Sequence, residues 1–223
     1  MKMINPPILV EDSNLLVINK PPGFVVNRAE SVKEETIQDW VEKTYSIFIE
    51  DRGGIVHRID KETSGCLLIA KDLPTFVELQ RQFKDREIKK TYLALVHGRI
   101  VPEEGEINAP VGRLPWNRER FGIVPGGKEA RTRYKVQKYI KQYSFVELYP
   151  ETGRTHQIRV HLKYINHPIV GDWQYAGRKT ARADRVWAPR VMLHAWKISF
   201  THPVTQKRVD VEAPIPDDMK SIL

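Results

Sequence analysis

The residues best suited to chemistry lie between positions 53 and 72, where GGIVHRIDKETSGCLLIAKD places Asp60 between two segments of buried character. A carboxylate mounted on a tight connection can act as a covalent nucleophile or stabilise positive charge. If residues 57–60 are extended, Arg58 and Asp60 share one face of the chain. The pair then fits either a reactive site or a structural ion pair, and both readings stay open on composition alone.

The segments after Asp60 indicate how it is positioned. KETSG at 61–65 is polar and ends in glycine, so it predicts a turn in which Thr63 or Ser64 can satisfy backbone groups. CLLIAK at 66–71 is a short apolar run, typical of a strand buried on both faces. Its single cysteine, Cys66, is expected to be a small buried hydrophobic residue and not a nucleophile.

Hydrophobic period and turn residues predict the other elements. Two helices are expected, one over 36–45 with Trp40 in the core and one capped by Asp72 and running through Phe83. The expected strands are two around the turn EDSN at 11–14, one over 91–100, a hairpin from 131–140 and 144–149, and closing strands in 191–200 and 207–214. The chain is expected to end in a short helix or tail at 219–223. Residues 102–130 are rich in Gly, Pro and charge, so we expect a long loop that orders on nucleic acid.

A helix capped by Thr155 is expected to run through HQIRVHLKYI. On it Ile158, Leu162 and Ile165 fall on one face, whereas His156, Arg159 and Lys163 share another, cationic face. The histidines of this region, which are His156, His161 and His167, are the competing candidates for a metal site. Their spacing points them apart, and no zinc motif accompanies them, so no metal is expected.

The excess of positive charge in the sequence favours a polyanionic partner. The 223 residues carry 36 basic and 28 acidic side chains, a net charge of +8. Between Gly112 and Tyr143 nine basic residues face only two glutamates. Aromatic residues interleave with this charge and suit stacking on RNA bases; they are Trp116, Phe121, Tyr134, Tyr175 and Trp187. The arginines predicted to bind RNA are Arg118, Arg120, Arg131 and Arg133.

Other classes are disfavoured. Apolar residues make up 41% of the chain, and no uninterrupted apolar run approaches the roughly 20 residues that cross a bilayer. The first residues lack the continuous apolar stretch of a signal peptide, so a cytoplasmic protein is expected. One cysteine excludes an internal disulfide.

Four segments together resemble one known family. HRIDKETSGCLLIAK at 57–71 is similar to the HRLDxxTSGLLLxAK signature of the RluA-type pseudouridine synthases. The other three are INKPPGFVV at 18–26, KKTYLALVHG at 89–98 and ETGRTHQIRVHLKYINHPIVGD at 151–172, and all four lie in the family's order. Small departures are Ile59 and Cys66, which stand where leucine is usual.

The resemblance implies an α+β fold with a mixed, mainly antiparallel sheet and flanking helices, in one catalytic domain over 1–223. It implies an RNA pseudouridine synthase that flips out a uridine of structured ribosomal or transfer RNA and isomerises it without a cofactor. Many relatives carry an N-terminal S4 RNA-binding module. Here the entry strand starts near the first residue, so we expect a stand-alone catalytic domain, and a monomer.

The resemblance also assigns roles. Asp60 is the catalytic carboxylate, Tyr92 stacks on the target base and in one version of the mechanism removes a proton from the sugar, and Arg159 forms an ion pair with Asp60. Arg58 suits the space that the flipped base leaves. The remaining residues assigned to substrate binding are His57, Thr63, Arg154 and His156.

Two rival functions are weighed against this one. The first is an RNA-binding or chaperone-like protein that keeps the fold without isomerisation, against which Asp60, Tyr92 and Arg159 argue. The second is a glycosidase or base-releasing hydrolase, which needs a second carboxylate in range. Glu62 is the nearby candidate in sequence, and it lies in the predicted turn.

Overall fold

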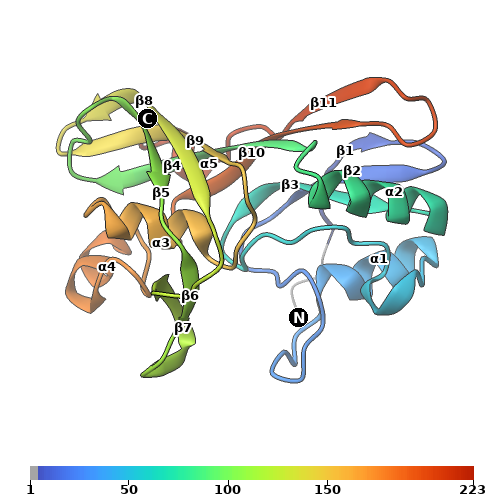
Figure 1. Ribbon diagram of the computed structural model, residues 1–223, viewed down its shortest axis with the longest axis horizontal. Coiled ribbons are helices and arrows are strands. Elements are labelled where there is room, and N and C mark those ends of the chain that lie inside the picture. The colour runs from blue at the N-terminus through green and yellow to red at the C-terminus, as the bar shows by residue number, and fades with distance from the viewer. Residues whose placement is uncertain (1–4) are drawn as a thin grey trace. The chain divides into compact units, whose positions relative to one another are not determined.

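The structure is a computed structural model that describes residues 5–223, and these residues form two compact units. Unit 1 contains the chain up to Lys89 together with Ala195–Pro214, and unit 2 contains Lys90–His194 and Ile215–Leu223. The chain enters unit 2 within β4 (Lys89–His97), leaves it within β10 (Leu193–Thr201) and enters it again after Pro214. Figure 1 labels both strands and colours the chain by residue number. Both units contain antiparallel strand pairs, and helices accompany them, which confirms the predicted α+β class. The single domain over 1–223 stays a prediction.

Strands from both ends of the sequence build the sheet of unit 1. These strands are β1 (Ile8–Glu11), β2 (Leu15–Lys20), β3 (Ser64–Ala70), β10 and β11 (Arg208–Glu212). The turn between β1 and β2 forms because the Asp12 carboxylate accepts the N–H groups of Asn14 and Leu15, at 2.7 and 2.9 Å. All seven residues of β3 are buried, which confirms the strand predicted from the apolar run after the turn. Cys66 is buried in it, and burial raises the pKa of its thiol to about 12.

Side-chain caps fix both helices of unit 1 where the sequence places them. In α1 (Ile37–Tyr45) the Thr36 hydroxyl accepts the Asp39 N–H and the Asp39 carboxylate accepts the Thr36 N–H. In α2 (Leu73–Lys84) the Asp72 carboxylate accepts the Thr75 N–H at 2.8 Å. Trp40 is buried, as predicted. A short 3-10 helix, η1 (Glu50–Arg52), precedes the segment that carries Asp60.

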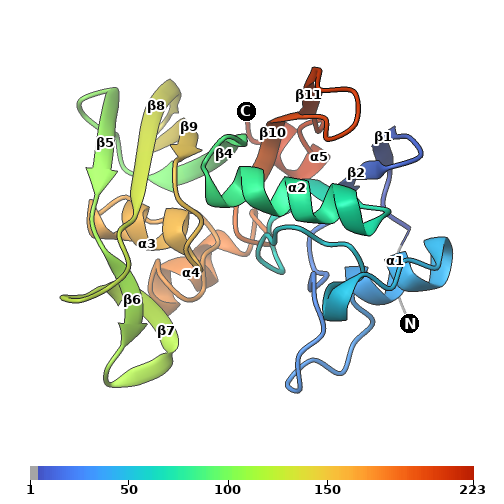
Figure 2. The same cartoon turned by 45° about the vertical axis from the view of Figure 1, so that its right-hand side comes forward.

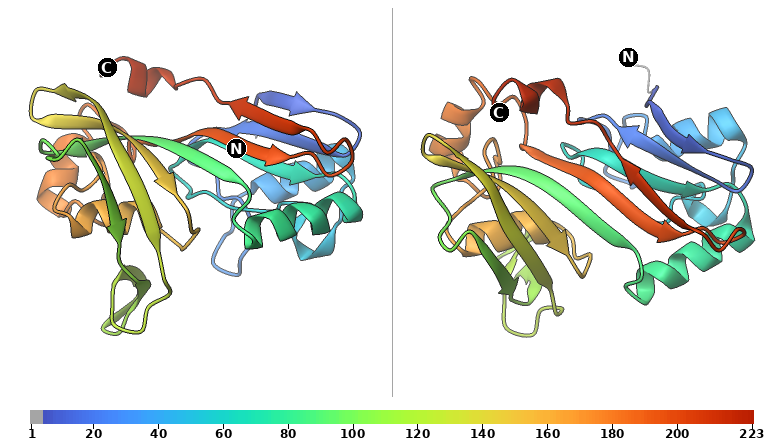
Figure 3. Two further views of the ribbon diagram at one scale, coloured as in Figure 1. Left: turned by 45° about the horizontal axis from the view of Figure 1, so that its top comes forward. Right: turned by 90° about the horizontal axis from the view of Figure 1, so that it is seen from above.

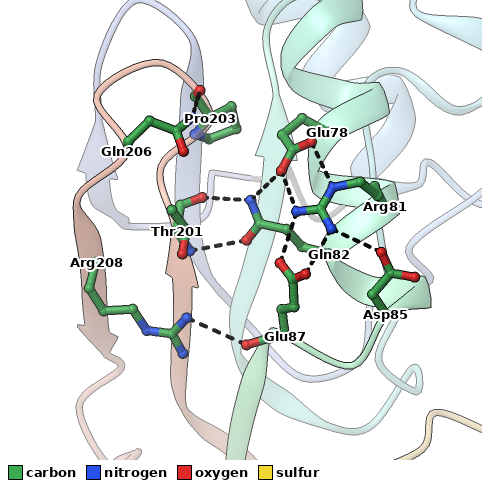
Figure 4. Close-up of polar contacts among 9 residues, drawn as sticks. All are labelled: Glu78, Arg81, Gln82, Asp85, Glu87, Thr201, Pro203, Gln206 and Arg208. Carbon is green, nitrogen blue, oxygen red and sulfur yellow. Dashed lines mark hydrogen bonds and ion pairs between the residues drawn. The ribbon is translucent and has the colours of Figure 1, made fainter.

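The side chain of Gln82 ties α2 to β10 (Figure 4). Its Nε2 donates to the Thr201 carbonyl oxygen at 2.8 Å, and its Oε1 accepts the Thr201 N–H at 3.0 Å. Beside it the exposed Arg81 pairs with three carboxylates, those of Glu78, Asp85 and Glu87. Exposed pairs contribute about 0–1 kcal/mol each, so the buried amide does more to fix the helix.

The sheet of unit 2 has the strand order β4, β9, β8, β5. Its long pair is β8 (Arg131–Ile140) with β9 (Tyr143–Pro150), the predicted hairpin, and the two strands lie side by side in Figure 3. The turn uses Lys141 in a left-handed conformation, with φ of 53°.

The expectation of a long loop over 102–130 is wrong. This segment contains β5 (Glu104–Asn108), paired with β8, and the hairpin of β6 (Val111–Leu114) and β7 (Asn117–Ile123). The hairpin extends past the ends of β5 and β8 in Figure 2. Its strands bury few side chains and pair Gly112 with Gly122, so they lack the apolar alternation on which a strand prediction depends.

Three helices complete unit 2, namely α3 (Gln157–Tyr164), α4 (Arg178–Asp184) and α5 (Asp217–Lys220). The helix α4 was not predicted, and α5 matches the expected terminal helix. The N-terminal cap assigned to Thr155 is wrong, because α3 begins after His156 in a left-handed conformation, without a side-chain cap. In residues 5–223 no helix combines the length and apolar character needed to cross a membrane.

Candidate active site

The segment that carries Asp60 is irregular and is attached to β3. Residues 57–60 form no hydrogen-bonded strand. His57 accepts the Leu68 N–H through Nε2 at 2.9 Å, and its ring packs on Phe83 at 4.8 Å. His57 therefore anchors the segment, a structural role beside the predicted substrate contact.

The turn after Asp60 forms as predicted, and a buried lysine secures it. The Thr63 N–H donates to the Asp60 carbonyl oxygen at 3.0 Å. Lys20 is fully buried, and its Nζ donates to the carbonyl oxygens of Pro21, Phe24 and Lys61 at 2.9, 3.0 and 3.1 Å. The Gly23 N–H also donates to Lys61, at 2.7 Å. The INKPPG turn thus supports the residue that follows Asp60.

Sequence reasoning missed Lys20, although a signal was present. A lysine that ends the apolar run LLVIN directly before two prolines is costly to bury unless its ammonium group meets several acceptors. That requirement singles it out as a residue that organises nearby carbonyl groups.

The two other predicted residues of this segment have different surroundings. Arg58 is exposed and, among the described residues, makes no ion pair, so the structural pair with Asp60 is not formed. Thr63 is buried, and its Oγ1 has no hydrogen-bond partner within residues 5–223. The Thr63 hydroxyl therefore does not hydrogen-bond the backbone groups of the turn, contrary to the expectation. Asp60 itself is partly buried.

Tyr92 lies on β4 in unit 2, where it pairs with Leu148 of β9 and is partly buried. Lys90 precedes it by two positions and so lies on the same face of the strand. Burial lowers the pKa of the Lys90 ammonium group to about 8. A Cβ atom at Gly153 would lie 3.8 Å from Lys90 Nζ, so this ammonium group adjoins the TGRTHQIR segment. Lys90 is a second residue that the sequence analysis did not single out.

Arg159 is held by a carboxylate that the sequence analysis did not assign. Its Nε and Nη2 donate to the two oxygens of Asp172, at 2.7 and 2.9 Å, and both side chains are buried. Asp172 Oδ1 also accepts the N–H groups of Gln174 and Tyr175. The expected cationic face of α3 is therefore wrong for Arg159, which is internal, whereas Lys163 is exposed.

Tyr175 contacts both His156 and the guanidinium group of Arg159. His156 Nδ1 lies 2.9 Å from the Tyr175 hydroxyl, and the Arg159 guanidinium lies over the Tyr175 ring at 4.9 Å. The Tyr175 oxygen also accepts the Phe121 N–H at 3.4 Å. His156 and Arg159, which belong to the same motif, are therefore linked by Tyr175. The same tyrosine links α3 to the β6–β7 hairpin.

Gln157 fixes the loop before α3. Its Oε1 accepts from the Thr152 hydroxyl and the Arg154 N–H at 2.7 and 2.9 Å, and its Nε2 donates to the Arg131 carbonyl oxygen and the Thr132 hydroxyl. Arg154 donates from Nε to the Glu129 carbonyl oxygen at 3.0 Å. Several hydrogen bonds therefore attach the loop that carries Arg154 and His156 to β8 and to the residue Glu129 just before it.

The three histidines weighed as metal ligands have other contacts. His161 is buried between the Thr132 hydroxyl and the Ala109 carbonyl oxygen, at 2.9 and 3.0 Å, and desolvation lowers the pKa of its imidazole. His167 contacts the His97 carbonyl oxygen. Across the described chain no three His, Cys, Asp or Glu side chains form a group that could hold a metal ion.

The predicted RNA-binding arginines differ in their surroundings. Arg131 lies 3.6 Å from Glu106 and 3.8 Å from Glu151, and Arg133 lies 3.1 Å from Glu151. The positive charge counted along residues 112–143 is therefore partly offset by glutamates from neighbouring strands. Arg118 is exposed on β7 and Arg120 is partly buried there.

The aromatic residues predicted to stack on bases also divide. Tyr134 and Tyr175 are buried, with their hydroxyl groups near the Pro102 carbonyl oxygen and His156 Nδ1. They are parts of the core and not stacking surfaces. Trp116 and Trp187 are exposed, at 79% and 40%, although the Trp187 ring packs on Tyr143 at 5.4 Å, and their stacking on bases stays a prediction.

Comparisons with known proteins identify the family. The sequence model described as RNA pseudouridylate synthase matches residues 14–164, a range that contains Asp60, Tyr92 and Arg159. Ribosomal large subunit pseudouridine synthase D of Nitrosomonas europaea is 41% identical over 97% of this chain and 64% of its own length. The protein of the same name from Neisseria meningitidis serogroup A is 41% identical over 97% of this chain and 60% of its own length. The chain thus spans about three fifths of these relatives.

Solved structures agree. Human RNA pseudouridylate synthase domain containing 1 superimposes with a TM-score of 0.77 at 30% identity, over 94% of this chain and 83% of that chain. Human RNA pseudouridylate synthase domain containing 4 gives a TM-score of 0.74 at 25% identity, over 94% and 88% of the two chains. The predicted resemblance is confirmed, and the chain belongs to the RluA-type family of RNA pseudouridylate synthases.

Proposed function

We propose that this protein is an RNA pseudouridine synthase that converts specific uridines of structured ribosomal RNA to pseudouridine. The observation that supports the proposal is the family match over residues 14–164, a range that includes Asp60 and the segment that resembles the family signature. Relatives named for the ribosomal large subunit favour ribosomal RNA over transfer RNA. We further propose a cytoplasmic monomer that needs no cofactor.

In the proposed reaction the bond between C1′ of ribose and N1 of uracil breaks, and a bond from C1′ to C5 forms. The proton lost from C5 is balanced by one gained at N1, so no oxidant or second substrate is required. The Asp60 carboxylate attacks the sugar or the base, or stabilises positive charge at the sugar. Each of these roles requires the ionised form of Asp60.

Arg159 is the proposed counter-charge for Asp60. Burial disfavours an ionised carboxylate, and a neighbouring guanidinium group offsets this cost. The bidentate pair with Asp172 supports the role, because it fixes the direction of the Arg159 side chain before any substrate binds.

Tyr92 is proposed to stack on the uracil ring, and Arg58 to fill the place of the flipped nucleotide. Flipping costs a few kcal/mol of lost stacking and pairing, which a planar guanidinium group can partly restore. The exposure of Arg58 and its lack of an ion pair in the described chain are compatible with this use.

The proposal is tested by incubating the purified chain with transcripts of ribosomal and of transfer RNA and mapping pseudouridines. We expect pseudouridine at specific positions of ribosomal RNA. Asp60→Asn should abolish it while RNA affinity and the unfolding midpoint stay near wild type. Substantial turnover by Asp60→Asn would contradict the assignment, and modification of transfer RNA alone would overturn the proposed substrate.

A further inference from the structure

Unit 2 contains an open groove beside the β6–β7 hairpin that the roles proposed above do not use. Its volume is about 870 Å³, toward the upper end of the roughly 300–1,000 Å³ of ligand sites. Three segments line it, namely the hairpin from Leu114 to Ile123, one face of α3, and residues 173–178. The face of α3 consists of Val160, Lys163 and Tyr164, which are three and four positions apart and so project together.

Two large aromatic side chains border the groove and remain open to solvent. Tyr164 is 57% exposed and Trp173 is 49% exposed. In the part of the chain that the structure describes, neither ring stacks on another ring or on a cation. Exposed aromatic surface rimmed by polar side chains marks a binding site more often than isolated exposed residues do.

The charges around these rings suit an anion. Arg120, Lys163 and Arg178 line the groove together with one carboxylate, Glu119. Cations next to uncovered aromatic rings form the combination that binds single-stranded nucleic acid, because rings accept bases and cations accept phosphates. A small neutral ligand could stack on the rings but would make no use of the three cations.

The floor of the groove is a packed cluster and not a mobile surface. Val160 and Tyr175 are buried together, with Phe121 packed against them. The Tyr175 hydroxyl meets His156 Nδ1 and the Phe121 N–H. The hairpin wall and the helix wall are thereby joined at the base, so the groove exists before a ligand arrives.

We propose that this groove binds an unpaired stretch of the RNA substrate, with bases stacked on Tyr164 and Trp173 and phosphates held by Lys163 and Arg178. The inference rests on the proposed function and adds the kind of RNA required, namely a single-stranded segment near the modified uridine. Duplex RNA buries its base faces and would leave both rings unused.

The test measures binding of a fluorescein-labelled ten-nucleotide single-stranded RNA of mixed sequence to the full chain by anisotropy. Tyr164→Ala and Trp173→Ala should each weaken binding about fivefold or more, the effect of losing one stacked base. Phe48→Ala is the matched control, because Phe48 is 71% exposed and lies in unit 1, and it should bind as wild type does.

The charge prediction uses the salt dependence of the same binding. Lys163→Ala together with Arg178→Ala should reduce the slope of log affinity against log salt by about 1.4, since each single-strand phosphate contact contributes about 0.7. Lys179→Ala is the control, because Lys179 adjoins Arg178 in sequence and lies outside the groove.

Three results would overturn the inference: no binding by wild type, unchanged binding by both aromatic variants, or displacement of the RNA by an oligoglutamate peptide at equal charge concentration. The last would identify an acidic peptide as the occupant. Binding that depends on both rings, with no pseudouridine formed on any RNA, would contradict the proposed function and leave the groove as an RNA site.

Discussion

Asp172 receives two parallel hydrogen bonds from the guanidinium group of Arg159, from Nε at 2.7 Å and from Nη2 at 2.9 Å, with the carboxylate fully buried. Two backbone N–H groups complete the set of donors around this carboxylate. Arg159, the proposed counter-charge of Asp60, is therefore fixed by a buried carboxylate, and removal of that carboxylate should lower both the stability and the activity of the protein.

Asp172→Asn should lower the free energy of unfolding by roughly 3–5 kcal/mol, because it leaves the buried Arg159 charge unpaired. Arg159→Ala should cost a similar amount, and the double variant should cost less than the sum of both. Urea unfolding measures all three. Asp217→Asn is the control, because Asp217 is fully exposed and should change stability by less than about 0.5 kcal/mol.

The two parts of this prediction can fail separately. Additive losses in the double variant would show that the pair is not coupled. Wild-type rates of pseudouridine formation by Asp172→Asn would show that the orientation of Arg159 does not matter for the reaction.

Lys20→Met should destabilise the protein by at least about 2 kcal/mol, because three carbonyl oxygens lose their charged donor. The rate of isomerisation should fall as well, since one of these oxygens belongs to Lys61, directly after Asp60. Thermal unfolding and the pseudouridine assay check the two effects. Lys207→Met, at an exposed position of unit 1, should change neither. An unaltered rate in Lys20→Met would exclude the proposed support of the Asp60 turn.

Gly65→Ala tests the close contact that begins β3. Gly65 has φ of +113°, and a Cβ atom there would lie 2.2 Å from the Ala195 carbonyl oxygen. We expect a loss of at least about 2 kcal/mol from overpacking and backbone strain combined. Gly126→Ala has φ of +73° and open space around its Cβ, so it isolates the strain. Equal losses in the two variants would show that the contact with Ala195 is relieved without cost.

Elements with a strong local signal were predictable from the sequence. The helix over 36–45, the cap Asp72, the strand after Gly65 and the hairpin of β8 and β9 were all predicted from neighbouring residues, and the structure confirms each. The strands β5 to β7 were not predicted, because their stability comes from pairing with other strands and few of their own side chains are buried.

The site shows the same division. Asp60, Tyr92 and Arg159 were assigned from motifs that lie within single segments, and these roles stay predictions. Asp172 and Lys20 were not singled out, because neither residue type shows which group it contacts: Asp172 binds Arg159, 13 positions earlier, and Lys20 binds backbone carbonyl oxygens, one of them at Lys61. Likewise, the local charge count missed Glu106 and Glu151, which approach Arg131 only through strand pairing.

The paired arginines of β8 should contribute less to RNA binding than those of the hairpin. Replacing all four predicted arginines should weaken binding and flatten its salt dependence. Arg118→Ala with Arg120→Ala should account for more of the change than Arg131→Ala with Arg133→Ala, because glutamates already offset the latter pair. Binding titrations at several salt concentrations measure the slopes. A larger effect of the β8 pair would show that RNA displaces its glutamate partners.

Lys90 should make stability depend on pH in the alkaline range. Burial lowers its pKa to about 8, whereas an unfolded lysine titrates near 10.4. Between these values the unfolded chain binds a proton that the native protein has released, so the free energy of unfolding rises with pH. Below about pH 8 both states are protonated and the native state carries the full cost of the buried charge, on the order of 3 kcal/mol.

Lys90→Met removes this titration and keeps an unbranched side chain that is one heavy atom shorter. The variant should be more stable than wild type at pH 7.5, and the difference should shrink as the pH approaches about 10.5. Taking the difference between the two proteins cancels groups common to both, such as Tyr149, whose pKa is raised to about 12 by desolvation and its bond to Glu147. Urea unfolding at half-unit pH intervals measures the curve. A difference that is constant from pH 7.5 to 10.5 would show that the Lys90 ammonium group remains hydrated in the native protein.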